Sequence, residues 1–150
     1  MPTVIAINRS EKKGVIKQPI PEGLFKVEHG LEGDAHAGNW HRQVSLLGIE
    51  SIHKMEQIGI EGLCSGKFAE NITTEGIVLY ELPVGTQFRI GSCLMEVTQI
   101  GKECHKHCAI YHQVGNCVMP TEGIFARVLE GGIIRPGDEI LVLSRLPSPG

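Results

Sequence analysis

The sequence has 150 residues, of which 41% are hydrophobic and 21% are charged, and its net charge is −3. A chain of this length buries roughly 70% of its unfolded surface, so we expect one domain over residues 1–150 that folds without a disulfide or metal. Because neither half of the chain is basic, the positive stripe of a nucleic-acid-binding protein is missing, and nucleic acid is not an expected partner.

The beginning of the chain and its cysteines indicate where the protein works. Residues 1–8 have no basic region before an apolar core and are typical of a first strand, not of a signal peptide. No apolar run is long enough to cross a bilayer, so no membrane association is expected. The five cysteines are odd in number and unevenly spaced, unlike a secreted disulfide framework. We therefore expect a cytoplasmic protein with free thiols.

Short β-rich runs separated by glycine and proline make up most of the chain. Strands are predicted over 3–8, 43–47, 86–90, 93–100 and 140–143. The Gly91-Ser92 pair separates two runs in which apolar and polar residues alternate, and this pattern predicts a two-residue hairpin. The residues that the alternation turns towards the core are Phe88, Ile90, Cys93, Met95 and Val97.

Only two stretches show the spacing of a helix. Ile49 to Ile58 places apolar and polar residues three and four apart in the manner of one helical face. Ile124 to Glu130 is short and ends before Gly131-Gly132, a pair that is typical of a helix stop. Many short strands with few helices favour a β-barrel or a β-sandwich.

The most unusual segment runs from Gly101 to Cys117 and holds three of the five cysteines and three of the seven histidines. It directly follows a predicted strand, where binding loops commonly lie on a rigid scaffold. Histidines and Lys106 beside a thiol favour its thiolate form, which is both a nucleophile and a soft metal ligand. The segment predicts a functional thiol at Cys104 or Cys108, whereas the simpler interpretation makes Cys108 a small buried hydrophobe.

Zinc is an alternative occupant of the same segment. Cys104 and Cys108 have a spacing that zinc ligands use, and His112 and Cys117 could supply a second pair. Such a loop would have to double back on itself, and a domain of this size does not need a metal to fold. A zinc-stabilised interaction domain is therefore kept as a further hypothesis.

Two other polar segments could face the same site. Residues 30–43 are rich in glycine, which lets the backbone approach a ligand closely, and their arginine could bind a phosphate through two hydrogen bonds. Residues 67–73 supply a cation and an amide just before a strand. Residues 30–43 could also be an ordinary surface loop, with Asp34 capping a turn. The side chains predicted to bind a cofactor are Asp34, His36, Arg42, Lys67 and Asn71.

Together these segments resemble the MOSC family, named for the C-terminal domain of molybdenum-cofactor sulfurase. The matching stretches are 30–36, 42–46, 68–73, 82–85, 90–91, 104–108, 123–128 and 137–140. Their order and spacing cover nearly the whole chain, and the combination is specific although no single stretch is. The resemblance implies a mainly β fold, a closed β-barrel like that of pyruvate kinase, with a few short helices.

The resemblance also implies that the chain binds molybdenum cofactor (molybdopterin) or carries sulfur for it. Relatives bind the molybdenum-bearing pterin, carry sulfur destined for it or reduce N-hydroxylated substrates with it. Activity as a sulfur transferase or as a component of a molybdenum-dependent oxidoreductase is therefore left open. In relatives a loop cysteine ligates molybdenum or bears the sulfur as a persulfide. It matches Cys108 best, as catalytic thiol and metal ligand, with Cys104 second, although this loop lacks the proline that often precedes it.

The larger relatives suggest what partners the chain needs. The sequence has neither the pyridoxal-phosphate-dependent module of cofactor sulfurases nor the additional N-terminal β-domain of amidoxime-reducing relatives, so we expect a stand-alone form. Pyridoxal phosphate would then act only through a partner, a cysteine desulfurase, and a molybdoenzyme is the other expected partner. A non-catalytic module that stores or delivers the finished cofactor is the alternative.

Overall fold

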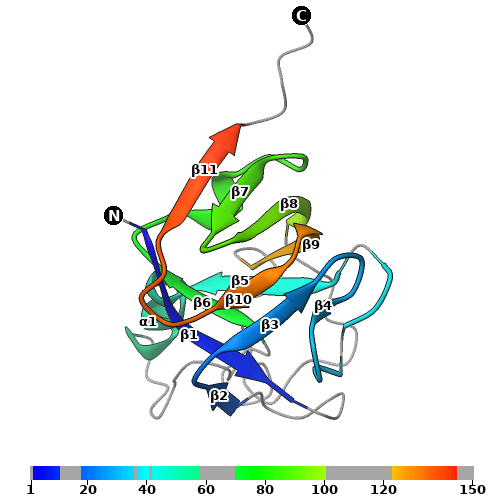
Figure 1. Ribbon diagram of the computed structural model, residues 1–150. Coiled ribbons are helices and arrows are strands. Elements are labelled where there is room, and N and C mark those ends of the chain that lie inside the picture. Colours follow the sequence, from blue (N-terminus) through cyan, green and yellow to red (C-terminus); the bar gives the residue numbers. More distant parts are fainter. Residues whose placement is uncertain are drawn as a thin grey trace, which may run out of the picture.

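The computed structural model describes residues 2–10, 18–35, 37–40, 42–57, 70–100 and 123–144. The fold is mainly β, as predicted (Figure 1). Its elements are β1 (Thr3–Arg9), β2 (Gln18–Ile20), β3 (Gly23–Lys26), β4 (Gly30–Leu31), β5 (Val44–Gly48), α1 (Ile49–Gln57), β6 (Ile72–Glu75), η1 (Leu79–Glu81), β7 (Gln87–Ile90), β8 (Cys93–Ile100), β9 (Ile124–Glu130), β10 (Gly132–Ile134) and β11 (Ile140–Ser144). None of the helices in these ranges is both long and apolar enough to span a bilayer.

The strands form two sheets. The larger has eight strands in the order β11-β7-β8-β9-β5-β6-β1-β2, and the smaller has the order β10-β3-β4. Within the described residues, β5 and β6 pair in parallel and the other ladders are antiparallel. The smaller sheet packs against β8 and β9, and α1 packs against β5 and β6.

The prediction of a closed barrel is not supported, because the larger sheet is open and ends at β11 and β2. The start of β1 does approach the residues before β11: Thr3 and Glu139 form an isolated antiparallel bridge, and Val4 donates a backbone hydrogen bond to Asp138 at 2.9 Å. Further along, β1 pairs with β2 over residues 7–9. No ladder between the described strands therefore joins β1 to β11.

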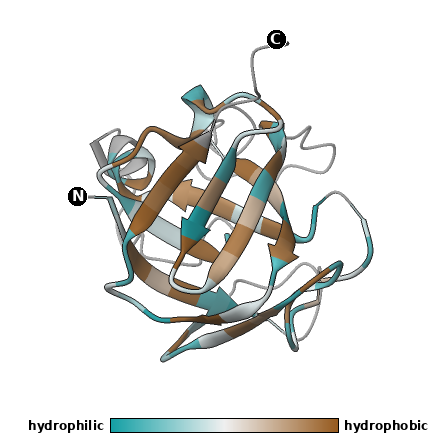
Figure 2. Ribbon diagram, turned by 45° about the horizontal axis from the view of Figure 1, so that its top comes forward, coloured by the Kyte–Doolittle hydropathy of each residue, from teal (hydrophilic) through white to brown (hydrophobic). Residues whose placement is uncertain are grey.

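The predicted hairpin is confirmed. Gly91 and Ser92 connect β7 to β8, Ile90 pairs with Cys93, and Gly91 has a φ of 57°, which a side chain disfavours. The five side chains predicted to face inwards all belong to the hydrophobic core. Figure 2 shows apolar residues, drawn in brown, along most of the strands. Alternation at a period of two was therefore a reliable guide to this part of the core.

The helix predicted over Ile124 to Glu130 is wrong, because these residues form β9. Ile124, Ala126 and Val128 alternate into the core, and β9 pairs with β8 on one side and β5 on the other. Residues 124–130 have mixed secondary-structure propensity, so the neighbouring strands decide their conformation. As a strand, their backbone N–H and C=O groups form hydrogen bonds with the edges of β5 and β8. The glycines after it lead into β10 instead of ending a helix.

Two glycines with positive φ offer a matched test of how tightly the two sheets are joined. A Cβ on Gly30 (φ 107°) would collide with the backbone carbonyl of Gln43, whereas a Cβ on Gly137 (φ 96°) would meet nothing within 4 Å. We expect Gly137→Ala to cost about 1–2 kcal/mol through backbone strain alone. Gly30→Ala should cost about 3 kcal/mol or more, since the backbone must also move. Urea unfolding measures both, and equal costs would contradict the close approach at Gly30.

Candidate functional site

Three of the predicted site residues, Asp34, Arg42 and Asn71, lie in the described part of the chain. The predicted thiols Cys104 and Cys108, together with His36 and Lys67, lie outside the described residues. The described part of the candidate site consists of these three side chains and the strand ends that carry the cysteine segment.

The ends of the cysteine-bearing segment are fixed in the middle of the larger sheet. Ile100, the last residue of β8, pairs directly with Ile124, the first residue of β9. Ile124 also pairs with Leu46 of β5. Residues 101–122 therefore leave and rejoin the sheet at two neighbouring strands, which lie among the inner strands of the sheet.

The Asn71 side chain is buried and ties three strands together. Its Oδ1 accepts hydrogen bonds from Ser45 N at 3.0 Å and from Ser45 Oγ at 3.2 Å, and its Nδ2 donates to Asn8 O at 3.3 Å. Its backbone accepts from Asn8 N at 2.7 Å and donates to Ser45 O at 2.9 Å. Asn71 thus holds the starts of β5 and β6 and the end of β1 in register.

A second buried chain of polar groups begins at Asn8. Its Nδ2 donates to Thr73 Oγ1 at 3.0 Å, and the Thr73 hydroxyl donates to Glu70 Oε2 at 2.8 Å. The Asn8, Glu70 and Thr73 residues are all fully buried. Such a network stabilises a fold only when its members are satisfied. Asn8 Oδ1 is an exception, because this buried atom has no hydrogen-bond partner among the described residues.

Asp34 fixes the backbone at the end of β1. Its Oδ1 accepts a hydrogen bond from Ser10 N at 3.1 Å, and Ala35 N donates to Ser10 O at 2.8 Å. Ser10 lies two residues after Asn8. The glycine-rich segment that carries Asp34 is therefore bonded to the same end of the sheet as Asn71.

Arg42 lies against both ends of the cysteine-bearing segment. Its Nε donates to Gln99 Oε1 at 3.1 Å, and its guanidinium carbon is 5.3 Å from the centre of the Phe125 ring and 5.9 Å from that of Trp40. Gln99 immediately precedes Ile100, and Phe125 immediately follows Ile124. The guanidinium contacts both aromatic rings and is planar, so its remaining N–H groups lie in one plane for an anion.

These groups share one face of the larger sheet. Ile7, Leu46, Ile72 and Ile124 point into the hydrophobic core, so the residues that alternate with them point to the opposite face. This outer face carries one polar or aromatic residue from each of five strands: Asn8, Thr73, Ser45, Phe125 and Gln99. Phe125 pairs with Ser45 on one side and with Gln99 on the other. The structure therefore brings Arg42, Asn71 and the strand ends of the cysteine segment to one side of the sheet.

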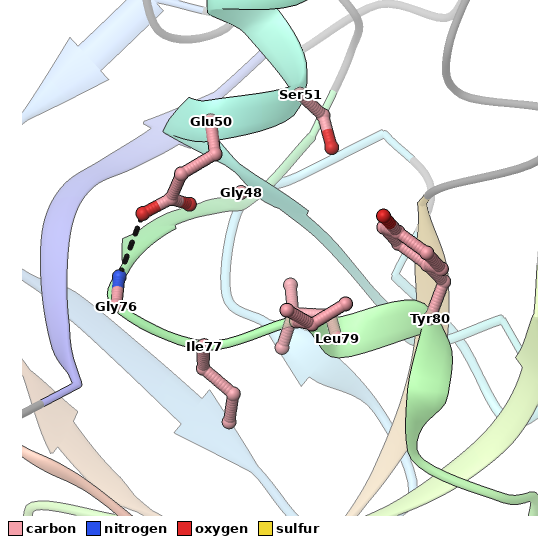
Figure 3. A pocket seen from close by; sticks show the side chains of 8 residues that line it. Gly48, Glu50, Ser51, Gly76, Ile77, Leu79 and Tyr80 are labelled. Atoms are coloured by element: carbon pink, nitrogen blue, oxygen red, sulfur yellow. Dashed lines mark hydrogen bonds between the residues drawn. The ribbon is translucent and has the colours of Figure 1, made fainter.

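A small pocket lies where β5 meets α1 (Figure 3). Glu50 Oε2 accepts a hydrogen bond from Gly76 N at 2.8 Å, and the Ser51 and Tyr80 hydroxyls point into the same space. The cavity volume is about 170 Å³, below the roughly 300 Å³ at which small-molecule sites begin. It is too small for a cofactor-sized ligand.

Cys93 behaves as the sequence predicted for a core-facing thiol. It is fully buried, and burial raises its pKa from 9.0 to about 11, with the Asp138 carboxylate adding to the rise and Arg89 opposing it. A thiol of this kind is a poor nucleophile at neutral pH. The described part of the chain also contains no group of three histidine, cysteine, aspartate or glutamate side chains that could hold a metal ion.

Several polar residues of this face were not predicted as functional. Asn8, Ser45 and Thr73 alternate with buried apolar residues, a pattern that usually marks a solvent-exposed face, yet all three are buried. Gln99 and Phe125 gain their importance from strand register, which a single sequence does not reveal.

The Asn71 network predicts a large stability loss on truncation. Asn71→Ala leaves the Ser45 N–H and the Asn8 carbonyl without their partners in a buried region, which should cost about 3 kcal/mol of unfolding free energy. Asn39→Ala, at an exposed asparagine, should change it by less than about 0.5 kcal/mol. Urea denaturation compares the unfolding free energies of the two variants. A small effect of Asn71→Ala would show that the hydrogen bonds of this side chain are dispensable.

The raised pKa of Cys93 predicts a pH dependence of stability. The unfolded thiol loses its proton near pH 9 and the folded thiol near pH 11. Folding stability is thus complete below pH 9 and falls by about 2–3 kcal/mol as the pH rises to 11. Cys93→Ala should lack this component. Unfolding curves of both proteins between these pH values test it, and parallel pH profiles would refute the assignment.

The chain is similar in sequence and in structure to several known proteins. The relative YflK, an uncharacterized protein of Bacillus subtilis (strain 168), is 27% identical over 142 residues, which are 88% of this chain and 64% of that protein. The chain thus spans less than two thirds of that relative's length.

Solved structures share the fold. The YUAD protein of Bacillus subtilis superposes with a TM-score of 0.77 at 17% identity, over 93% of this chain and 94% of that one. YiiM from Geobacillus stearothermophilus superposes with a TM-score of 0.76 at 20% identity, over 99% of this chain and 78% of that one. A family model described as the MOSC domain matches residues 33–141, well over half of the sequence. The chain therefore belongs to the MOSC domain family.

Proposed function

We propose that this chain binds molybdenum cofactor, or carries sulfur for it, through the thiol of Cys108, with Cys104 as the second candidate. The family is associated with this cofactor. The observation that carries the proposal is the position of Arg42, whose guanidinium contacts both Gln99 and Phe125 at the two ends of the cysteine-bearing segment. A cationic group and a soft thiol would then meet at one site.

The anionic end of the cofactor suits Arg42. One of its five N–H groups donates to Gln99, which leaves the outer edge of the guanidinium for a phosphate. Contacts with Phe125 and Trp40 hold the plane. Lys67, outside the described residues, would add a second positive charge.

The molybdenum end suits the cysteine segment. Molybdenum in a sulfur-rich site takes soft thiolate ligands, and the described residues offer no competing group of metal ligands. The buried acceptor Asn8 Oδ1 would also gain from a donor, because an unsatisfied buried group costs about 1–3 kcal/mol. The residues present therefore fit the cofactor in the chemistry of both ends.

Each side chain then has a defined task. The bound cofactor would supply a metal centre capable of oxygen or sulfur transfer. Cys108 would bind at that centre as a thiolate, and Arg42 would hold the phosphate. Asp34 and Asn71 act as positioning residues, because their buried side chains fix the backbone of β1, β5 and β6. His36, next in the glycine-rich segment, would complete the contacts to the pterin.

Sulfur carrying would follow a balanced exchange. The Cys108 thiolate attacks the outer sulfur of a persulfide on a partner cysteine desulfurase. A sulfur–sulfur bond forms at Cys108, the bond at the partner breaks, and the partner's cysteine leaves as a thiolate. The pyridoxal phosphate belongs to that partner, and a molybdoenzyme would receive the finished product.

Two other functions would use the same residues differently. A storage or delivery module would bind the cofactor stoichiometrically without turnover, whereas an enzyme would consume a substrate. A zinc-stabilised interaction domain would hold one zinc ion in the cysteine segment and no pterin. Metal and pterin contents separate zinc from molybdenum, and a turnover assay separates the carrier from the enzyme.

The test is loss of the ligand on removing one thiol. Protein from molybdate-fed, cofactor-competent cells should contain molybdenum and a fluorescent oxidised pterin in comparable amounts. A desulfurase with cysteine should add the mass of one sulfur atom. Cys108→Ser nearly preserves side-chain volume, so the fold should survive while molybdenum content and persulfide loading fall at least about tenfold, as expected for a lost metal ligand.

Cys93→Ser is the matched control. It should lower stability by about 1–3 kcal/mol through a buried hydroxyl and leave both loadings intact. Loss of loading in Cys104→Ser alone would move the function to Cys104. Zinc at one ion per chain without pterin, or full loading in both loop variants, would refute the proposal.

A further inference from the structure

The small pocket between β5 and α1 combines apolar walls with a group of oxygen atoms (Figure 3). Ile77 and Leu79 line the apolar part. Glu50, Ser51 and Tyr80 direct their side-chain oxygens towards the same space. The volume of about 170 Å³ equals that of roughly five or six water molecules in the liquid. The pocket therefore suits a ligand of about as many heavy atoms.

The missing side chain of Gly48 leaves a space bordered by oxygens. A Cβ on Gly48 would lie 2.9 Å from Glu50 Oε1. The same point is 3.8 Å from Ile77 O and 3.8 Å from Thr74 Oγ1. The Thr74 hydroxyl is fully buried and has no hydrogen-bond partner among the described residues. Because an unsatisfied buried hydroxyl costs about 1–3 kcal/mol, this side of the pocket would gain from a ligand with hydrogen-bond donors.

The charge of the pocket favours a cation. Glu50 is the one charged side chain among the described residues that line it. Its Oε2 accepts a hydrogen bond from Gly76 N at 2.8 Å, and within the described part of the chain it forms no salt bridge. A carboxylate oxygen beside a carbonyl accepts hydrogen bonds and repels anions.

The apolar walls distinguish an organic cation from a metal ion. A hard metal ion takes about six to eight oxygen ligands, and the described residues include no group of three acidic, histidine or cysteine side chains that could hold one. Ile77 and Leu79 supply no ligand atom, but they can pack against methylene groups. A short alkyl chain that ends in an ammonium group matches both parts of the pocket.

We propose that this pocket binds a primary alkylammonium group, carried by a small free amine or by a lysine side chain of a partner. The ammonium lies over Gly48 and donates to Glu50 Oε1, and its other N–H groups are directed at the neighbouring oxygens. Its alkyl stem packs on Ile77 and Leu79. The inference goes beyond the proposed function, because it uses neither Arg42 nor the cysteine segment.

The backbone amides of Gly48 and Gly76 report on the pocket in nitrogen-15 NMR. n-Butylammonium chloride should shift both resonances in a saturable way, with the weak, millimolar affinity expected of so small a ligand. Butanol lacks the charge and tetramethylammonium lacks N–H donors, so each should bind at least about tenfold more weakly. A blocked lysine tripeptide carries the same ammonium group on a backbone. Its affinity relative to n-butylammonium distinguishes a lysine side chain from a free amine.

Two variants change the pocket while leaving the backbone unstrained. Glu50→Gln keeps an acceptor for Gly76 N but loses the charge, and it should weaken n-butylammonium binding at least about tenfold. Gly48→Ala should abolish binding, because its Cβ fills the space beside Glu50 Oε1 and Gly48 has no positive φ. Glu81→Gln, at an exposed glutamate that does not line the pocket, is the control and should bind like the unaltered protein.

Urea unfolding checks that each variant is folded. Full affinity in folded Glu50→Gln or Gly48→Ala would overturn the proposal, as would equal binding of butanol or the same shifts with potassium chloride. Cys108→Ser should bind n-butylammonium unchanged, so this outcome is separate from that of the thiol and molybdenum measurements.

Discussion

The side-chain amide of Asn71 joins β5, β6 and β1 at one level of the sheet, where β5 and β6 run in parallel. A parallel pair cannot be connected by a tight hairpin, so its register must be set by other contacts. Asn71 provides them, because it bonds to both the backbone and the hydroxyl of Ser45. Since a slip of one residue would turn every side chain of β5 over, this amide also decides which residues face the core.

The register of β5 determines the register of β9 and β8, the two strands that carry the cysteine segment. β9 pairs with β5, and β8 pairs with β9, so Ile100 and Ile124 are placed by a continuous series of backbone hydrogen bonds that begins at Asn71. Arg42, two residues before β5, reaches Gln99 and Phe125 across these strands. The position of Arg42 relative to the strand ends at Ile100 and Ile124 is therefore set by the sheet.

Local patterns predicted what depends on local structure. The hairpin at Gly91-Ser92 and the core positions of β7 and β8 followed from alternation and a turn pair. The conformation of 124–130 did not, because two neighbouring strands outweigh the weak helical spacing of seven residues. Whether the sheet closes into a barrel depends on which strands pair with β1. This is a long-range pairing that cannot be predicted from composition.

In the candidate site, too, the sequence predicted residue types but not the contacts between them. Arg42 and Asn71 were found by residue type, but their partners were not, because Ser45, Gln99 and Phe125 approach them only through register. The sequence also did not predict that Asn8, Ser45 and Thr73 are buried, because they occupy alternate positions that ordinarily face water. Burying so many polar groups gives little net stability even when they are bonded, and apolar residues would stabilise this face more simply. The directional hydrogen bonds of these polar groups instead fix the register of β1, β5 and β6.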